Sequence, residues 1–340
     1  MARNSLLEIN RVKWSEMEDG KEWDDFVISN EGSVFHMWAW RKVLEGDESR
    51  PLYLTCRDPM GRVLAVCPFF YRTGRHLQYL DSLPWSHMAG PIVDKQAADP
   101  LVIIRSLRRA VRFSPFKPVI AMRVKVHQEQ LVQIMSGLGF QHNMTQLFIV
   151  DLHETGPDHV WKNGFQKHDR QAIKYYERAG ATLGFLEREN DYVEYVNLKR
   201  GLKDARMEGE EFLGKIRTHM ADKLKVVSVL LNGRIVAGTM LLCNPPNSTV
   251  SILRTRFAET GKNIHSLITL LNWRVINWAH ENGLRYVDFG SYPTASSLDP
   301  RRHPYKLRAR FEANLVPRYE FILPTSDVSY SVLRRIGRLL

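Results

Sequence analysis

The feature that most constrains the fold is an internal repeat. Residues 51–71 and 225–243 share one pattern: an apolar segment, a short polar turn and a second apolar segment. Both contain Gly-Arg followed by two aliphatic residues and Ala, at Gly61–Ala65 and at Gly233–Ala237. Asn232 before Gly233 predicts a two-residue hairpin, because a type I′ turn needs positive φ at both positions. The repeat therefore predicts two copies of one structural unit.

The segments after each hairpin match in the same order. Each hairpin precedes a strand, a helix and a further strand, predicted at 76–80, 99–113 and 118–125 and again at 249–257, 263–282 and 284–289. The second helix has apolar residues near the 3.6 period and ends at Gly283. We predict an α/β fold with mixed sheets flanked by helices. The expected domains are 1–150 and 151–317, with 318–340 able to pack back on the first.

Length and charge agree with two domains and a polyanionic partner. A chain of 340 residues exceeds what one hydrophobic core usually serves. Lys and Arg number 48 against 37 Asp and Glu, a net charge of +11. This surplus favours RNA, a phosphorylated substrate or an acidic membrane surface. The alternative is a basic protein without such a partner.

The sequence gives no signal for a membrane span, a disulfide framework or a metal site. The most apolar stretch, 226–243, is interrupted by Asn232 and Arg234, and the N-terminus has no secretory apolar region. The cysteines Cys56, Cys67 and Cys243 are scattered, without ligand-type spacing. We expect a cytoplasmic protein with no metal and no stable protein partner.

A predicted helix over 161–179 carries a row of cations. Lys167, Arg170, Lys174 and Arg178 are spaced so that they share one face. Like charges repel, so we predict that Lys167, Arg170 and Lys174 bind substrate phosphates. The alternative is an ordinary solvated helix face.

A second basic segment, 291–321, follows a predicted strand. It contains several cations: Arg301, Arg302, His303, Lys306, Arg308 and Arg310. The ends of strands are common sites for chemistry in α/β folds, and a Lys or Arg beside a reacting carbonyl stabilises the negative charge that develops there. The alternative is a basic surface loop packed through Tyr305 and Phe311.

The loop at 83–91 is the candidate site in the first half. It is rich in Pro and Gly and includes Trp85 and His87, which we predict to line a substrate pocket; ordinary loop packing is the alternative. No familiar nucleophile, P-loop or dinucleotide motif occurs. This favours direct transfer between two bound substrates, which needs positioning and charge stabilisation but no covalent intermediate.

Four stretches resemble the FemAB (Fem/Mur ligase-like peptidyltransferase) family. They are 167–183, 230–242, 270–291 and 305–321. The last resembles the family's pattern of an aromatic residue, Lys, Arg and Phe-Gly, with Ala313 where the family often has Gly. The resemblance covers most of the second half, and the first half matches in outline.

The resemblance implies two tandem GNAT-like (acetyltransferase-like) domains. It also implies transfer of an amino acid from aminoacyl-tRNA to an amine acceptor, as in peptidoglycan cross-bridge synthesis. In this family a Lys beside an aromatic residue lies by the transferred acyl group, which corresponds to Lys306 after Tyr305. The charged-helix motif corresponds to Arg170 and Lys174. Arg308, two residues after Lys306, is a further expected substrate contact.

Two other functions stay open. An N-acyltransferase of this fold would take acyl-CoA, held by R-x-x-G-x-G/A before a helix, where this chain has only Gly261 within 254–263. A non-catalytic RNA- or membrane-surface-binding protein is suggested by an amphipathic, Arg-rich C-terminal segment, 326–340. That segment is also a candidate for peripheral contact with the inner face of the membrane. On every reading the donor is a substrate, and no bound cofactor is expected.

Overall fold

A computed structural model describes residues 12–46, 49–73, 78–84, 86, 88–96, 99–112, 121–126, 129–138, 141–198, 210–244, 247–258, 264–293 and 311–324. The chain divides into two compact units, Met1–Thr145 with Pro317–Leu340 (unit 1) and Gln146–Val316 (unit 2). The boundaries expected from the sequence lie after residues 150 and 317. The predicted C-terminal amphipathic segment lies outside the described residues.

Unit 1 is a mixed sheet with helices. Its elements are β1 (Lys13–Glu16), α2 (Gly20–Ser29), η1 (Val34–His36), α3 (Trp40–Leu44), β2 (Ser49–Arg57), β3 (Val63–Thr73), β4 (Gln78–Asp81), β5 (Ile92–Val93), α4 (Pro100–Arg112), β6 (Ala121–Val126) and α5 (Glu129–Gly137). The strand order is β1-β2-β3-β4-β6-β13, where β13 spans Asn314–Pro324 and enters unit 1 at Pro317. All neighbours are antiparallel except β4 and β6, which are parallel and joined through α4.

Unit 2 repeats this plan. Its elements are β7 (Gln141–Asp151, which begins in unit 1), α6 (Pro157–His159), η2 (Val160–Gly164), α7 (Lys167–Arg178), β8 (Thr182–Phe185), α8 (Glu189–Asn197), α9 (Glu210–His219), β9 (Leu224–Leu231), β10 (Arg234–Asn244), β11 (Thr249–Phe257), α10 (Ile264–Glu281) and β12 (Tyr286–Pro293). The strand order is β8-β9-β10-β11-β12, and again one pair, β11 and β12, is parallel and joined by a helix. The predicted order of hairpin, strand, helix and strand is present in both units.

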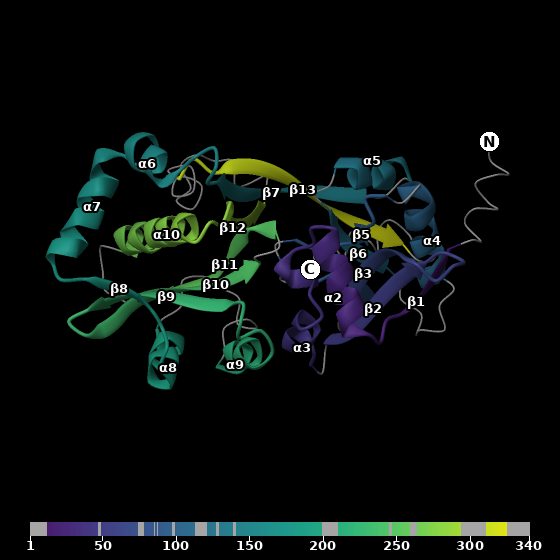
Figure 1. Cartoon of the computed structure of the whole chain (residues 1–340), viewed down its shortest axis with the longest axis horizontal. Helices are drawn as coiled ribbons and strands as arrows, with labels where there is room; N and C mark the ends of the chain where they lie inside the picture. The colour runs from purple at the N-terminus through teal and green to yellow at the C-terminus, as the bar shows by residue number, and fades with distance from the viewer. Residues whose placement is uncertain are drawn as a thin grey trace. The chain divides into compact units, whose positions relative to one another are not determined.

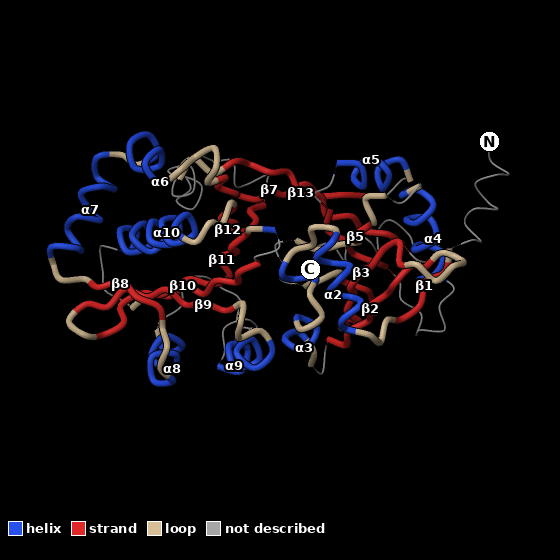
Figure 2. Tube along the Cα trace, viewed as in Figure 1, coloured by secondary structure: helices blue, strands red, loops and turns tan. Residues whose placement is uncertain are grey.

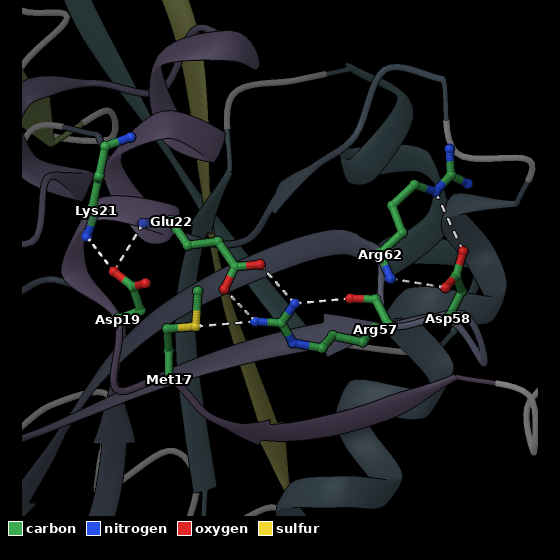
Figure 3. A network of polar contacts seen from close by, with 8 residues as sticks. Met17, Asp19, Lys21, Glu22, Arg57, Asp58 and Arg62 are labelled. Carbon is green, nitrogen blue, oxygen red and sulfur yellow. Dashed lines mark hydrogen bonds and ion pairs between the residues drawn. The ribbon is translucent and has the colours of Figure 1, made fainter.

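The shared Gly-Arg motif has a conformational cause. Asn232 and Gly233 have φ values of 52° and 75°, which makes the tight β9–β10 turn, and Gly61 has a φ of 85° in the β2–β3 connection. Positive φ strains most L-residues, so both connections require glycine. Beside Gly61, the Arg57 guanidinium donates to both carboxylate oxygens of Glu22 at 2.7 and 2.5 Å and to the Gly61 carbonyl at 2.8 Å (Figure 3). These bonds join the first turn of α2 to the hairpin.

Each unit has its own hydrophobic core. In unit 2 the core lies between the sheet and α10, with Leu271, Val275 and Phe289 fully or almost fully buried. Helix α10 runs along one side of strands β9 to β11, and α8 and α9 lie on the other side (Figures 1 and 2). In unit 1 the core packs α4 and α5 on the sheet, with Leu107 fully buried. In the part of the chain that the structure describes, no helix has the length and apolar character needed to span a bilayer.

Candidate active site

The parallel strands of unit 2 separate part-way along their length. Strands β11 and β12 pair over Thr249–Ser251 and Tyr286–Asp288, and the described residues contain no further β11–β12 pair. Strand β11 continues to Phe257 and β12 to Pro293. Two neighbouring strands that stop pairing have backbone donors and acceptors available to an extended ligand between them. This parted pair is the candidate site.

Both strands bend two residues after their last pair. In β11 the register with β10 shifts between Met240 and Leu241, so that Leu253 is an extra residue. A bulge of this kind bends its strand and increases the local twist. In β12 the corresponding bend is at Gly290, whose φ is 84°. The separation is therefore built into the backbone of both strands.

A buried carboxylate fixes the bend in β12. Asp288 is 1% exposed, and its Oδ1 accepts a hydrogen bond from the Gly290 backbone N–H at 2.7 Å. Its Oδ2 accepts from the Ser251 hydroxyl at 3.4 Å, across the last parallel pair. Asp288 thus ties the last paired residue of β11 to the first bent residues of β12.

Helix α8 is attached to β11 just beyond the separation. The Tyr195 hydroxyl donates to the Arg254 carbonyl at 3.0 Å, and the buried Arg256 guanidinium donates to the carbonyls of Val196 and Leu198. A Cβ on Gly238 would lie 2.7 Å from the Tyr195 ring, so this approach requires glycine. Burial raises the pKa of Tyr195, which keeps its hydroxyl protonated as a donor. These contacts position α8 beside the candidate site.

The structure gives the predicted cationic row two different environments. The Arg170 guanidinium is half-buried and donates to the carbonyls of Trp161 at 2.9 Å and Phe165, with a longer contact of 3.5 Å to that of Lys162. Lys167 and Lys174 are exposed. Arg170 therefore holds the preceding turn of the chain, and the exposed positive charge belongs to the two lysines and Arg178.

The helix containing this row is shorter than the sequence predicts. It begins at Lys167 rather than at 161, because Phe165 and Gln166 are extended and separate it from η2. Asp169 accounts for the new start: its buried carboxylate accepts from the Gln166 N–H at 3.0 Å and closes a capping box. Phe165, Ile173 and Tyr176 are buried in the core of unit 2.

The corresponding place in unit 1 is occupied by its own chain. Strands β4 and β6 pair over Tyr79–Asp81 and Ala121–Arg123, and the chain after β4 then turns along β6. There the buried Lys125 ammonium donates to the carbonyls of Leu83 at 3.2 Å and Ser86 at 3.4 Å. A Cβ on Gly90 would come within 2.3 Å of the Lys125 carbonyl, which shows how closely this loop packs on β6.

Five of the predicted site residues lie outside the described residues. Tyr305, Lys306 and Arg308 belong to 294–310, the segment that directly follows β12. Trp85 and His87 flank Ser86 in the loop that packs on Lys125. Their assignments as catalytic or substrate-binding residues remain predictions.

The cysteines are packing residues. Cys56, Cys67 and Cys243 are all free and buried. Burial raises the pKa of the Cys243 thiol to about 11 and that of Cys56 to about 12, so both are protonated near neutral pH. A protonated, buried thiol is a poor nucleophile.

One known protein family resembles the second half of the chain. The family model for the acetyltransferase (GNAT) domain matches residues 163–306. This region is similar to a GNAT domain. It coincides with most of unit 2, including the parted strands, and confirms the expectation of an acyltransferase domain. No curated protein sequence matches the chain.

Solved structures share the fold of the whole chain. FemX has a TM-score of 0.68 at 13% identity, with 95% of this chain and 99% of that chain covered. L-PGS from Bacillus licheniformis gives 0.62 at 16% identity, covering 96% and 98%. A tandem GNAT protein from the clavulanic acid biosynthesis pathway gives 0.59 at 12% identity, covering 94% and 100%. The fold implied by the FemAB resemblance, two tandem GNAT-like domains, is confirmed.

Several residues that shape the site were missed by sequence reasoning. Asp288 and Gly290 occur in VDFGS, where a glycine directly after an alternating strand could have signalled a bend. The bulge at Leu253 is not indicated by a glycine or any other feature of the local sequence. Lys125 lies on the polar face of β6, where the sequence alone indicates solvent.

Proposed function

We propose that this chain is an aminoacyltransferase that moves an amino acid from aminoacyl-tRNA to an amine acceptor. The observation that carries the proposal is the parted β11–β12 pair within the GNAT domain. The backbone groups that the parted strands leave available can pair with the amino group and ester carbonyl of an aminoacyl ester. The amides of an acyl-CoA donor could pair with them in the same way. The segment with Lys306 follows β12 directly, at the end of the strand that borders the gap.

The reaction needs positioned substrates and no enzyme nucleophile. The acceptor nitrogen attacks the ester carbonyl, the carbonyl oxygen gains negative charge, and the tRNA hydroxyl leaves as the amide forms. The nitrogen loses a proton and the leaving oxygen takes one, so the step balances. Lys306, whose role comes from the FemAB resemblance, would stabilise the oxyanion. The protonated, buried cysteines are consistent with direct transfer.

The exposed face of α7 supports a tRNA donor. Lys167, Lys174 and Arg178 are exposed on it, and Tyr175, which follows Lys174 in the helix, is 60% exposed. Lysine and arginine bind phosphates, and an exposed aromatic ring can stack on a base. The net charge of +11 also favours binding of a polyanion such as tRNA.

Acyl-CoA is the second candidate donor. The matched family is named for acetyltransferases, which favours it. The segment before α10 has a single glycine, Gly261, where a loop that binds the pyrophosphate of CoA usually has more. A third candidate, a non-catalytic RNA- or membrane-surface-binding protein, would have the basic face of α7 and no transfer activity.

The test is acyl transfer with both donors. The purified full chain is incubated with radiolabelled alanyl-tRNA or acetyl-CoA and a panel of small amines. We expect amide formation from alanyl-tRNA, and we expect Lys306→Ala to lower the rate about 100- to 1000-fold, as for the loss of one oxyanion donor. Lys42→Ala, at an exposed lysine of unit 1, is the matched control. Transfer from acetyl-CoA alone would establish the second candidate, and binding of tRNA without transfer from either donor would establish the third.

A further inference from the structure

Helix α2 ends in a turn that has a glutamate where glycine is usual. The Gly32 N–H donates to the Val27 carbonyl at 2.8 Å, which is the closing bond of a Schellman motif. In this motif the residue after the C-cap has positive φ and is usually glycine, but here it is Glu31, with a φ of 57°. A side chain is strained in this conformation, and strain of this kind is typical of functional sites. The end of the helix therefore gives no reason for a carboxylate at this position.

Glu31 lies in the lining of a pocket in unit 1. The pocket measures about 310 Å³, counted with its open mouth, which is near the lower limit for small-molecule sites. Its apolar lining residues are Ala89, Pro91, Ile92, Val126 and Leu131. The other lining residues come from the turn after α2 and from η1, and they are Asn30, Glu31, Gly32, Ser33 and His36. Such a lining fits a small molecule with an apolar body and one polar end.

The hydrogen bonds of His36 make the Ser33 hydroxyl an acceptor in this pocket. The Ser33 backbone N–H donates to His36 Nδ1 at 3.2 Å, so Nδ1 has a lone pair and the ring hydrogen is on Nε2. Nε2 donates to the Gly90 carbonyl at 3.3 Å. The Ser33 hydroxyl, 2.7 Å from Nδ1, therefore donates its hydrogen to that nitrogen.

The Ser33 oxygen then retains acceptor capacity although the residue is only 7% exposed. A hydroxyl oxygen has two lone pairs. The capping box at the start of η1 uses one of them at most, for the His36 N–H. The other lone pair is available to a donor in the pocket.

The Glu31 carboxylate supplies negative charge at the open side of the pocket. Its Oε1 lies 2.6 Å from the Lys95 ammonium, and the two side chains are 69% and 54% exposed. An exposed ion pair of this kind is weak, and one ammonium does not use every acceptor site of a carboxylate. The carboxylate can therefore bind a second cation.

We propose that this pocket binds a primary alkylamine in its ammonium form. The ammonium donates to the Ser33 oxygen and to the Glu31 carboxylate, and the alkyl chain lies against Val126 and Leu131. An ammonium has three donors and no acceptor, so it matches a polar lining that accepts. A carboxylate ligand would instead be repelled by Glu31. The proposal concerns unit 1 alone and does not depend on the transfer activity.

The experiment measures binding of n-butylamine to the full chain by isothermal titration calorimetry at pH 7.5, where an alkylamine is protonated. The comparison ligands are n-butanol and butyrate, which have the same chain length with a neutral and a negative head group. We expect a dissociation constant of about 1 mM for butylamine, at least about tenfold weaker binding of butanol and no binding of butyrate. Butyrate binding as tight as that of butylamine would overturn the proposal. No binding of butylamine up to about 20 mM would also overturn it.

Three variants test whether binding occurs in the pocket. Glu31→Gln keeps the size of the side chain and removes its charge, and Ser33→Ala removes the hydroxyl. Each should weaken binding of butylamine about tenfold, because each removes an acceptor of a charged donor. Glu18→Gln, at an exposed carboxylate before the other end of α2, is the matched control and should bind as the wild type does. Unchanged affinity in Glu31→Gln would overturn the proposal.

Glu31→Gly separates a role in binding from a role in folding. Glycine relieves the positive φ, so Tm should rise by about 2 °C, while binding of butylamine weakens about tenfold as in Glu31→Gln. A gain in stability together with a loss of binding is expected of a residue that serves a ligand. A lower Tm in Glu31→Gly would make the glutamate a structural residue of the turn and would overturn its role in binding.

Discussion

At the scale of single residues, Lys125 stands out because its burial is unfavourable to the folded state. Its side chain lies in β6, and desolvation lowers its pKa to about 8 from 10.5. Between these values the unfolded chain binds more protons than the folded one, so the free energy of unfolding rises as pH increases through this window. Below the window the burial penalty is present in full.

We predict that the stability of wild type relative to Lys125→Met increases between pH 7.5 and 9.5, by about 1–2 kcal/mol. Urea unfolding at each pH measures it. The comparison must be made with the variant at the same pH, because the three buried thiols also have raised pKa values. They lower the free energy of unfolding as pH rises near 9, and they do so in both proteins. A difference that stays constant with pH would mean that Lys125 is not buried in its charged form.

Gly290 is the second residue whose role can be isolated. Its φ of 84° permits the bend of β12 where the candidate site opens. We predict that Gly290→Ala lowers the free energy of unfolding by about 1–2 kcal/mol, since a Cβ is strained in this conformation. It should also lower kcat/KM for transfer, because the strand carries the chain toward Lys306.

The matched control for this change is Gly214→Ala in α9. A Cβ at Gly214 meets nothing within 4 Å. Helical glycine replaced by alanine should stabilise the protein by about 0.5–1 kcal/mol, with transfer unaffected. Thermal unfolding and steady-state kinetics measure both variants. If Gly290→Ala behaved like its control, the bend in β12 would not require a glycine.

At the scale of elements, α7 illustrates how one sequence pattern can serve two purposes. The spacing of its cations correctly predicted a shared face, but Arg170 uses its guanidinium to hold the backbone of the preceding turn. A sequence cannot reveal this, because the acceptors are carbonyls brought into reach only by the break at Phe165 and Gln166. The exposed lysines are the residues to vary, since changing Arg170 would disturb the fold.

We predict that Lys167→Glu with Lys174→Glu weakens binding of tRNA and lowers the slope of log affinity against log salt by about 2, one unit for each phosphate that the protein no longer neutralises. Fluorescence anisotropy with labelled tRNA from about 50 to 200 mM salt measures this slope. Lys21→Glu with Lys42→Glu in unit 1 makes the same change in net charge at exposed positions. Equal slopes for the two double variants would assign the effect to total charge and not to α7.

At the scale of the whole molecule, the repeat was the part of the fold that sequence could predict. Its marks are local: alternating apolar segments, and glycines at Gly61 and Gly233 that the turns require. The burial of the polar face of β6 depends on residues that are distant in the sequence, so the local pattern does not reveal it. In β6, the apolar residues Met122 and Val124 are buried in the core, as their type indicates. Lys125 has a side chain that normally faces solvent, but here a loop covers it. Its two hydrogen-bond acceptors there, Leu83 and Ser86, precede it by 42 and 39 residues in the sequence. The same limit applies to Asp288, whose partners are set by the pairing of distant strands.

Two separate cores predict two separable stabilities. Leu107 and Leu271 are each fully buried, one in each core. We predict that Leu107→Ala and Leu271→Ala each destabilise by about 2–5 kcal/mol. Native-state hydrogen exchange read by mass spectrometry should show faster exchange mainly in peptides of unit 1 for the first variant and of unit 2 for the second. Faster exchange spread equally over both units in either variant would mean that the two cores unfold as one cooperative structure. The two repeated units would then share a structural plan but would not be stable independently of each other.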